Sequence, residues 1–159
     1  MVDEAVWRLI SGFGDSGVIL PLVSAVALCL AWGGGGRLAL ALLLPVAGCG
    51  AAVAGLKLLF GACGGAVAGL AQASPSGHVA MSLAVYGGLA LLLARNETPA
   101  RRGLAAAAAA LLVALIALSR VRLGAHSPGE VLAGLGLGLG AVAAAAGLAR
   151  GLPPARPAW

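Results

Sequence analysis

The chain has two histidines, and each lies in a short polar segment between long apolar stretches. His78 ends the segment 75–78, and His126 lies within the segment 119–130. These segments concentrate hydroxyl, imidazole, guanidinium and carboxylate groups, whereas the flanking residues are almost all Ala, Leu, Val and Gly. Because ionisable groups are costly near lipid, their placement here indicates a functional site.

The first segment, Pro-Ser-Gly-His at 75–78, directly precedes an apolar stretch. The N–H groups at a helix N-terminus form a ready site for an anion, and Gly77 lets the backbone approach a ligand closely. Ser76 is expected to cap the helix, to donate to a phosphate oxygen, or to do both. His78 falls in the first turn, where an imidazole transfers protons near neutral pH.

The second segment supplies a guanidinium, an imidazole and a carboxylate. Arg120 suits the forked recognition of a phosphate group. His126 and Glu130 are four residues apart, so they share one face of a helix that begins near Ser127. A carboxylate on one ring nitrogen fixes the imidazole tautomer and leaves the other nitrogen nucleophilic. Glu130 also completes a capping box with Ser127, a structural role that is compatible with the chemical one.

Three more polar residues accompany these segments: Lys57, Ser119 and Arg122. Lys57 is expected to bind phosphate, although a lysine at the end of a span also reaches the interface by snorkelling. Ser119 and Arg122 are candidate auxiliary residues of the site. The alternative for Arg122 is contact with lipid headgroups or solvent.

Together these motifs resemble those of the type 2 phosphatidic acid phosphatases, which share their site with vanadium haloperoxidases and bacterial acid phosphatases. The chain carries the family's Pro-Ser-Gly-His motif and its Ser-Arg-x5-His-x3-acid motif, with Glu130 in place of the usual Asp. Of the family's Lys-x6-Arg-Pro motif, Lys57 is present, whereas Gly64 and Gly65 occupy the Arg and Pro positions. The resemblance covers roughly residues 50–140.

The resemblance implies a lipid phosphatase that needs neither metal nor cofactor and forms a phosphohistidine on His126. Glu130 would orient His126, and His78 would protonate the leaving oxygen and then activate water. The phosphoryl oxygens would be held by Lys57, Ser76, the Gly77 N–H and Arg120. Polyprenyl diphosphate, phosphatidylglycerol phosphate, phosphatidic acid and lipid A phosphate all fit such a site. Two alternatives stay open: a lipid phosphotransferase with the same site, and a non-catalytic phospholipid-binding homologue.

The composition places this site in a membrane protein. Hydrophobic residues make up 61% of the chain, charged residues 9%, and the mean hydropathy is +1.04, whereas average soluble domains carry about 25% charged residues. We predict an all-α integral membrane bundle of about five transmembrane helices, with an interfacial helix over residues 3–14. The predicted spans are 17–32, 38–56, 79–95, 103–118 and 130–149. Close helix packing within the bundle is favoured by Gly134, Gly136, Gly138 and Gly140.

The distribution of positive charge predicts the orientation of the bundle. One side holds six of the ten basic residues, and we expect it to be cytoplasmic; they are Arg37, Arg95, Arg101, Arg102, Arg150 and Arg156. The opposite face then receives Lys57, His78, Arg120 and His126. We expect one domain over residues 1–152, a disordered tail over 153–159 and residence in a bacterial inner (plasma) membrane, with no nucleic-acid partner.

Overall fold

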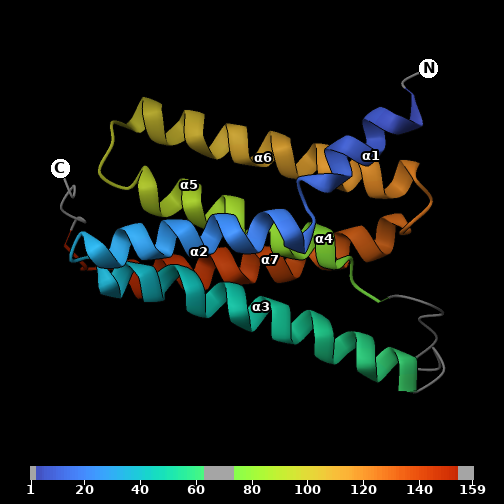
Figure 1. The fold of residues 1–159 in the computed structure, drawn as a ribbon, viewed down its shortest axis with the longest axis horizontal. Coiled ribbons are helices and arrows are strands. Elements are labelled where there is room, and N and C mark those ends of the chain that lie inside the picture. The colour runs from blue at the N-terminus through green and yellow to red at the C-terminus, as the bar shows by residue number, and fades with distance from the viewer. Residues whose placement is uncertain (1–2, 63–73, 154–159) are drawn as a thin grey trace.

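The computed structural model describes residues 3–62 and 74–153, and every regular element in these ranges is a helix. The elements are α1 (Glu4–Gly12), α2 (Ser16–Trp32), α3 (Gly36–Ala62), α4 (Gly77–Ser82), η1 (Leu83–Gly87), α5 (Gly88–Leu93), α6 (Pro99–Arg122) and α7 (Pro128–Ala149). Because α4, η1 and α5 follow without a break, they form one helix, Gly77–Leu93, with a π-helical turn at its centre. The long helices run side by side, and α1 lies beside the C-terminal end of α6 (Figure 1). The predicted all-α bundle is confirmed.

Within the described ranges, four helical segments are long and apolar enough to cross a bilayer. They are Glu4–Trp32, which contains α1 and α2, Gly36–Ala62, Pro99–Arg122 and Pro128–Ala149. The helix Gly77–Leu93 corresponds to the third of the five predicted spans. It is shorter than the four segments above and lies at the lower limit of about 17 residues for a membrane span. Helix α6 is longer than the span predicted at 103–118, because it begins directly after its Thr98 cap and continues through Arg122.

Helix α7 approaches the helix Gly77–Leu93 closely through two of its glycines. A Cβ atom built on Gly134 would lie 2.7 Å from the carbonyl oxygen of Ser76. One built on Gly138 would lie 2.7 Å from Leu83 Cβ and 2.8 Å from the Ala80 carbonyl oxygen. Small residues permit such approach between membrane helices. The face of α7 that carries Gly134 and Gly138 therefore sets the position of the helix that begins at the first polar segment.

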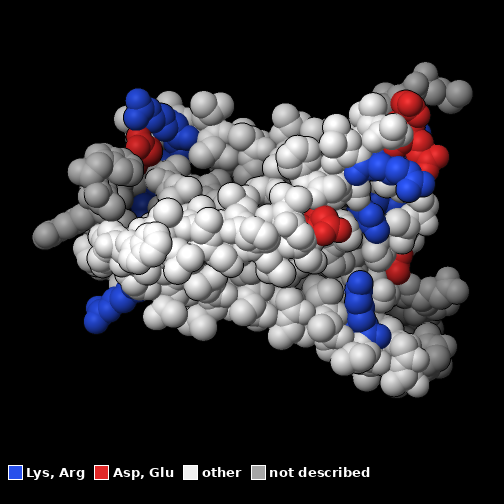
Figure 2. Space-filling view, viewed as in Figure 1, with Lys and Arg blue, Asp and Glu red and all other residues white. Residues whose placement is uncertain are grey.

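Charged side chains gather toward the two ends of the bundle and leave a wide uncharged belt between them (Figure 2). At one end α6 begins, and Arg101 pairs there with Glu97 at 2.8 Å. At the other end α3 and α6 finish while α4 and α7 begin (Figure 1). An apolar belt with polar ends is the surface expected of a bundle that crosses a bilayer.

Substituting Gly138 with Ala should destabilise the bundle, because the new methyl group would overlap the Ala80 carbonyl oxygen. Overpacking of this kind costs about 1–3 kcal/mol. At about 2–4 °C per kcal/mol, the melting temperature of the purified protein in detergent micelles should fall by several degrees. Gly140→Ala is the matched control, since a Cβ there meets no other element within 4 Å among the described residues. Equal melting temperatures of the two variants would contradict this packing.

Candidate active site

Both polar segments lie at the same end of the bundle. There α3 and α6 finish, α4 and α7 begin, and α1 packs beside α6 (Figure 1). His78 lies within electrostatic range of Arg120, His126 and Lys57. The alternating direction of the helices therefore brings together residues from three separate parts of the chain.

The turn between α6 and α7 positions His126. Gly124 adopts a left-handed backbone conformation with φ at 64°, which a residue with a side chain would adopt only with strain. The N–H groups of Ala125 and His126 then both donate to the Arg120 carbonyl, at 3.0 and 3.2 Å. The turn thus fixes the imidazole relative to Arg120, just before α7 begins at Pro128.

Glu130 ties this turn to α7 through a capping box. The Ser127 N–H donates to Glu130 Oε2 at 2.8 Å, and the Glu130 N–H donates to Ser127 Oγ at 3.3 Å. The same Oε2 lies 3.3 Å from His126 Nδ1, which is an ion-pair distance, although the two groups are not aligned for a hydrogen bond. The two side chains expose only 13% and 15% of their surface. Glu130 therefore occupies both positions expected of it, at the cap and beside the histidine.

Ser76 is completely buried, and its hydroxyl has no hydrogen-bond partner among the described residues. It directly precedes α4, yet its side chain does not cap the helix. Its N–H donates to the Glu130 carbonyl at 2.9 Å and so joins the start of α4 to the start of α7. A buried hydroxyl without a partner costs about 1–3 kcal/mol. Of the two roles expected for Ser76, capping is not observed, and donation to a phosphate oxygen stays a prediction.

Lys57 extends from α3 to the first turn of α4. A Cβ atom built on Gly77 would lie 3.7 Å from Lys57 Nζ and 3.3 Å from a methyl group of Val53. Because Gly77 has no side chain, the ammonium group lies directly beside the helix N-terminus. The first N–H groups of a helix have no intrahelical partner, and together with a positive charge they bind anions.

Helix α1 and the turn after it contribute two residues that no sequence motif had singled out. Ser11 Oγ accepts a hydrogen bond from Arg120 Nη1 at 2.9 Å, whereas Arg120 Nε is buried without a partner among the described residues. Asp15 Oδ2 lies 3.8 Å from His78 Nε2. The other oxygen of this carboxylate accepts the Gly17 N–H at 2.8 Å and thereby caps α2.

A cleft of about 390 Å³ opens between α1 and the ends of α4 and α6. Ser11, Asp15, His78 and Arg120 line it, whereas His126 and Glu130 do not. Its volume lies within the range of about 300–1,000 Å³ that is typical of small-molecule sites. The cleft is therefore large enough for a polar headgroup beside the cations.

Ser119 and Arg122, the two candidate auxiliary residues, have other partners. The buried Ser119 hydroxyl donates to the Ile116 carbonyl at 2.6 Å within its own helix. The Arg122 guanidinium lies over the ring of Trp7, 5.9 Å from its centroid, a cation–π contact that holds α1 against α6. Gly64 and Gly65 lie outside the described residues, as does the predicted tail from residue 154 onward.

The arrangement provides two imidazoles, two cations and a buried hydroxyl at one end of the bundle. Residues 3–62 and 74–153 contain no group of three or more His, Cys, Asp or Glu side chains that could hold a metal ion. Fixed cationic side chains and N–H groups are the donors that stabilise charge on a phosphoryl group during its transfer.

Comparison with protein families gave a match to the model described as the PAP2 superfamily, over residues 38–151. Comparisons with curated proteins and with solved structures gave no match. The matched range contains both histidines, Lys57, Arg120 and Glu130, whereas α1 and Asp15 precede it. Members of this superfamily are generally phosphatases that act on phosphate esters. The family match covers most of the chain and agrees with the motifs around both histidines, so the chain belongs to the PAP2 superfamily.

Proposed function

We propose that this protein is a membrane lipid phosphatase that hydrolyses a lipid phosphomonoester or diphosphate through a phosphohistidine on His126. The contact of His126 Nδ1 with Glu130, beside a second histidine at the end of an apolar bundle, carries the proposal. The negative charge of Glu130 near Nδ1 favours the tautomer that is protonated there, in which Nε2 is unprotonated and nucleophilic. A site at the end of the bundle suits a lipid, because its phosphate enters the site while its tail stays in the bilayer.

In the proposed reaction His126 Nε2 attacks phosphorus, so that a P–N bond forms and the bond to the leaving oxygen breaks. His78 donates a proton to the leaving oxygen. Water then attacks the phosphohistidine, His78 takes a proton from that water, and the P–N bond breaks to release inorganic phosphate. General acid–base catalysis of this kind contributes about 10²- to 10⁴-fold to the rate.

The proposed phosphate ligands are Lys57, Ser76, the Gly77 N–H and Arg120. Two donors in this set, Ser76 Oγ and Arg120 Nε, are buried without a protein partner in the described ranges. Buried polar groups are normally hydrogen-bonded. Donation to a phosphoryl oxygen would satisfy each of these donors, which supports their assignment to the substrate.

In this mechanism Asp15 is a positioning residue for His78. The hydrogen bond from the Gly17 N–H fixes the carboxylate with its second oxygen toward the imidazole. Its negative charge offsets the positive charges of Arg120 and Lys57, which also lie within electrostatic range of His78. Because the Asp15 side chain is 58% exposed, the contribution should not exceed about 1 kcal/mol.

We also propose that the site faces the non-cytoplasmic side of a bacterial inner membrane. Arg37, Arg95, Arg101, Arg102 and Arg150 belong to helix ends and turns on the opposite side of the bundle, and an excess of basic residues marks the cytoplasmic side of a membrane protein. Lipid phosphates exposed on that face, polyprenyl diphosphates among them, are the substrates we expect.

Purified protein should release phosphate from lipid phosphates in the presence of EDTA, and orthovanadate should inhibit this release. His126→Ala should lower the activity by at least about 10⁴-fold, because the nucleophile is removed. Phosphate release would be measured on a panel of polyprenyl diphosphate, phosphatidylglycerol phosphate and phosphatidic acid.

The same assay separates the alternatives. Full activity of His126→Ala would overturn the phosphohistidine mechanism. Product formation only in the presence of an added hydroxyl acceptor would identify a phosphotransferase. Binding of lipid phosphate without turnover would identify a non-catalytic phospholipid-binding protein.

Ser76→Ala should lower kcat/KM by about 10²-fold, because one preorganised donor to the phosphoryl group is lost. It should leave the melting temperature unchanged or raise it, since the hydroxyl has no partner among the described residues. Ser82→Ala is the matched control, because Ser82 lies at the end of the helix that Ser76 precedes, is equally buried, and has a hydroxyl without a partner among the described residues. A phosphate-binding role for Ser76 is wrong if both variants keep full activity.

Asp15→Asn should preserve the cap of α2, since Asn caps helices as well as Asp, but it removes the charge beside His78. Turnover of a lipid phosphate should fall by about fivefold, the equivalent of about 1 kcal/mol. The loss should be smaller with p-nitrophenyl phosphate, whose leaving group needs less protonation. Glu97→Gln, at the other end of the bundle, is the control. Equal losses on both substrates would indicate a purely structural role for Asp15.

A further inference from the structure

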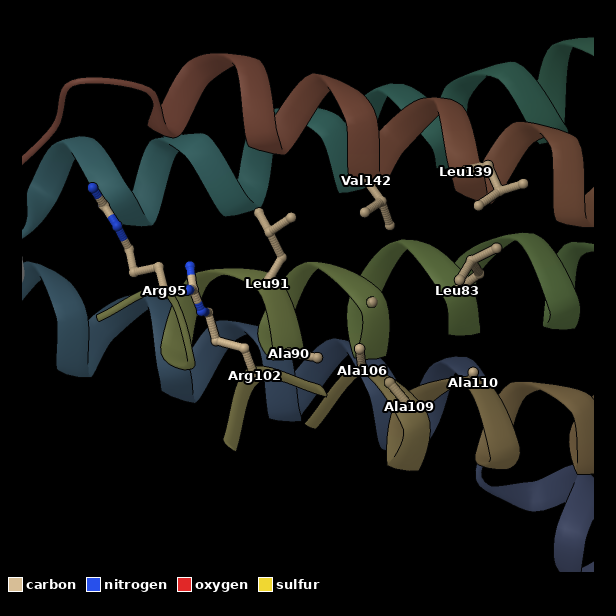
Figure 3. Close-up of a pocket in the computed structure, with 11 residues that line it drawn as sticks. Leu83, Ala90, Leu91, Arg95, Arg102, Ala106, Ala109, Ala110, Leu139 and Val142 are labelled. Atoms are coloured by element: carbon tan, nitrogen blue, oxygen red, sulfur yellow. The ribbon is translucent and has the colours of Figure 1, made fainter. Parts of the chain in front are cut away.

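An apolar groove of about 460 Å³ runs between α5, α6 and α7, in the belt of the bundle (Figure 3). Leucine and valine side chains line it on the side of Gly77–Leu93 and α7, whereas α6 contributes only alanines along this stretch. Figure 3 shows Leu91 pointing toward α7 and Val142 pointing from α7 into the groove, whereas Ala106 and Ala110 of α6 add only methyl groups to its wall. The middle of the groove is therefore suited to an aliphatic chain.

One end of the groove is strongly basic. Arg95 follows α5 and Arg102 lies in the first turn of α6, and both side chains lie at the same end of the groove (Figure 3). Arg95 Nη2 donates to the Leu152 carbonyl, while its Nη1 is buried without a partner among the described residues. In the same ranges Arg102 has no acidic partner, because Glu97 pairs with Arg101 instead.

We propose that this groove binds an anionic phospholipid of the bilayer, with the phosphate on Arg95 and Arg102 and an acyl chain along α6. Guanidinium groups bind phosphate through charge-assisted, often paired hydrogen bonds. Ala110 lies eight residues after Arg102, a distance of about 12 Å along the helix, and one leaflet of hydrocarbon is about 15 Å deep. The distance from the basic end to the far end of the groove therefore matches a lipid that lies within one leaflet.

This lipid site is distinct from the site at the histidines. Arg95 follows His78 by 17 residues along one nearly continuous helix, which separates them by about 25 Å. A lipid whose phosphate binds Arg95 cannot place that phosphate at His78. The proposal therefore does not depend on the phosphatase activity.

The adjacent face of α6 provides an internal comparison. A second apolar groove of about 500 Å³ lies there, and its polar end holds Glu97 and Arg101. These two side chains form an ion pair at 2.8 Å, so the charge at that end is neutralised. The two grooves resemble each other in size and apolar character, but only the first has unneutralised cations, which favours an anionic occupant there.

Native mass spectrometry of the full chain in detergent, with added phosphatidylglycerol or phosphatidylcholine, would test the proposal. Wild-type protein should retain phosphatidylglycerol in preference to phosphatidylcholine. Each basic residue near anionic lipid contributes a factor of about five, so Arg102→Gln should weaken the preference about fivefold and the Arg95→Gln, Arg102→Gln double variant about 25-fold. Arg101→Gln should leave it unchanged.

Two variants that leave Arg95 unchanged keep the test decisive if loss of its contact to Leu152 impairs folding. Arg102→Gln alone changes an exposed side chain, and Ala110→Phe fills the groove without changing any charge. Both should reduce the retention of phosphatidylglycerol while leaving the melting temperature of the lipid-free protein unchanged. Equal retention of both lipids by wild type would overturn the proposal, as would an Arg101→Gln loss equal to that of Arg102→Gln. Dimer formation through this face in place of lipid binding would also overturn it.

Discussion

The hydrogen bond from the Ser76 N–H to the Glu130 carbonyl holds the two polar segments of the site together. It forms because α7 approaches α4 at Gly134, where a Cβ atom would lie 2.7 Å from the Ser76 carbonyl oxygen. On one side of this bond the capping box presents His126, and on the other side the helix that carries His78 begins. The relative position of the two histidines thus depends on a helix contact that a larger residue than glycine would disturb.

The site also contains buried polar atoms that have no hydrogen-bond partner among the described residues. Within residues 3–62 and 74–153, five buried side-chain polar atoms have no hydrogen-bond partner, and three of them belong to Ser76, Arg120 and His126. Each such atom lowers stability, and a folded chain tolerates this mainly at functional sites. In the proposed mechanism Ser76 Oγ and Arg120 Nε donate to the phosphoryl group, whereas His126 Nδ1 faces Glu130. Under the proposed function, this end of the bundle is preorganised for a phosphoryl group at the expense of stability.

The sequence predicted the fold class and the grouping of the motif residues, because hydrophobic stretches set the helices and each polar segment adjoins a helix end. The spacing of His126 and Glu130 placed them on one helix face, and the structure has them 3.3 Å apart. The contact between Ser11 and Arg120 could not be predicted, since it joins residues 109 positions apart and depends on how α1 folds back onto α6. Arg122 shows the same limit: its type suited phosphate, yet its position on the helix directs it to Trp7.

Small residues have opposite effects in α7 and α6. In α7, Gly134 and Gly138 let the helix contact its neighbour, and the site requires this contact because it sets the geometry of both histidines. Helix α6 instead delivers Arg120 from its last turn, and its position is fixed at that end by α1. Its middle need not pack tightly, so Ala106 and Ala110 leave a groove beside it. In a soluble core such a space would forfeit packing energy, whereas the acyl chain that we propose for this groove would fill it. The alanine-rich face of α6 therefore suits a helix that contacts lipid.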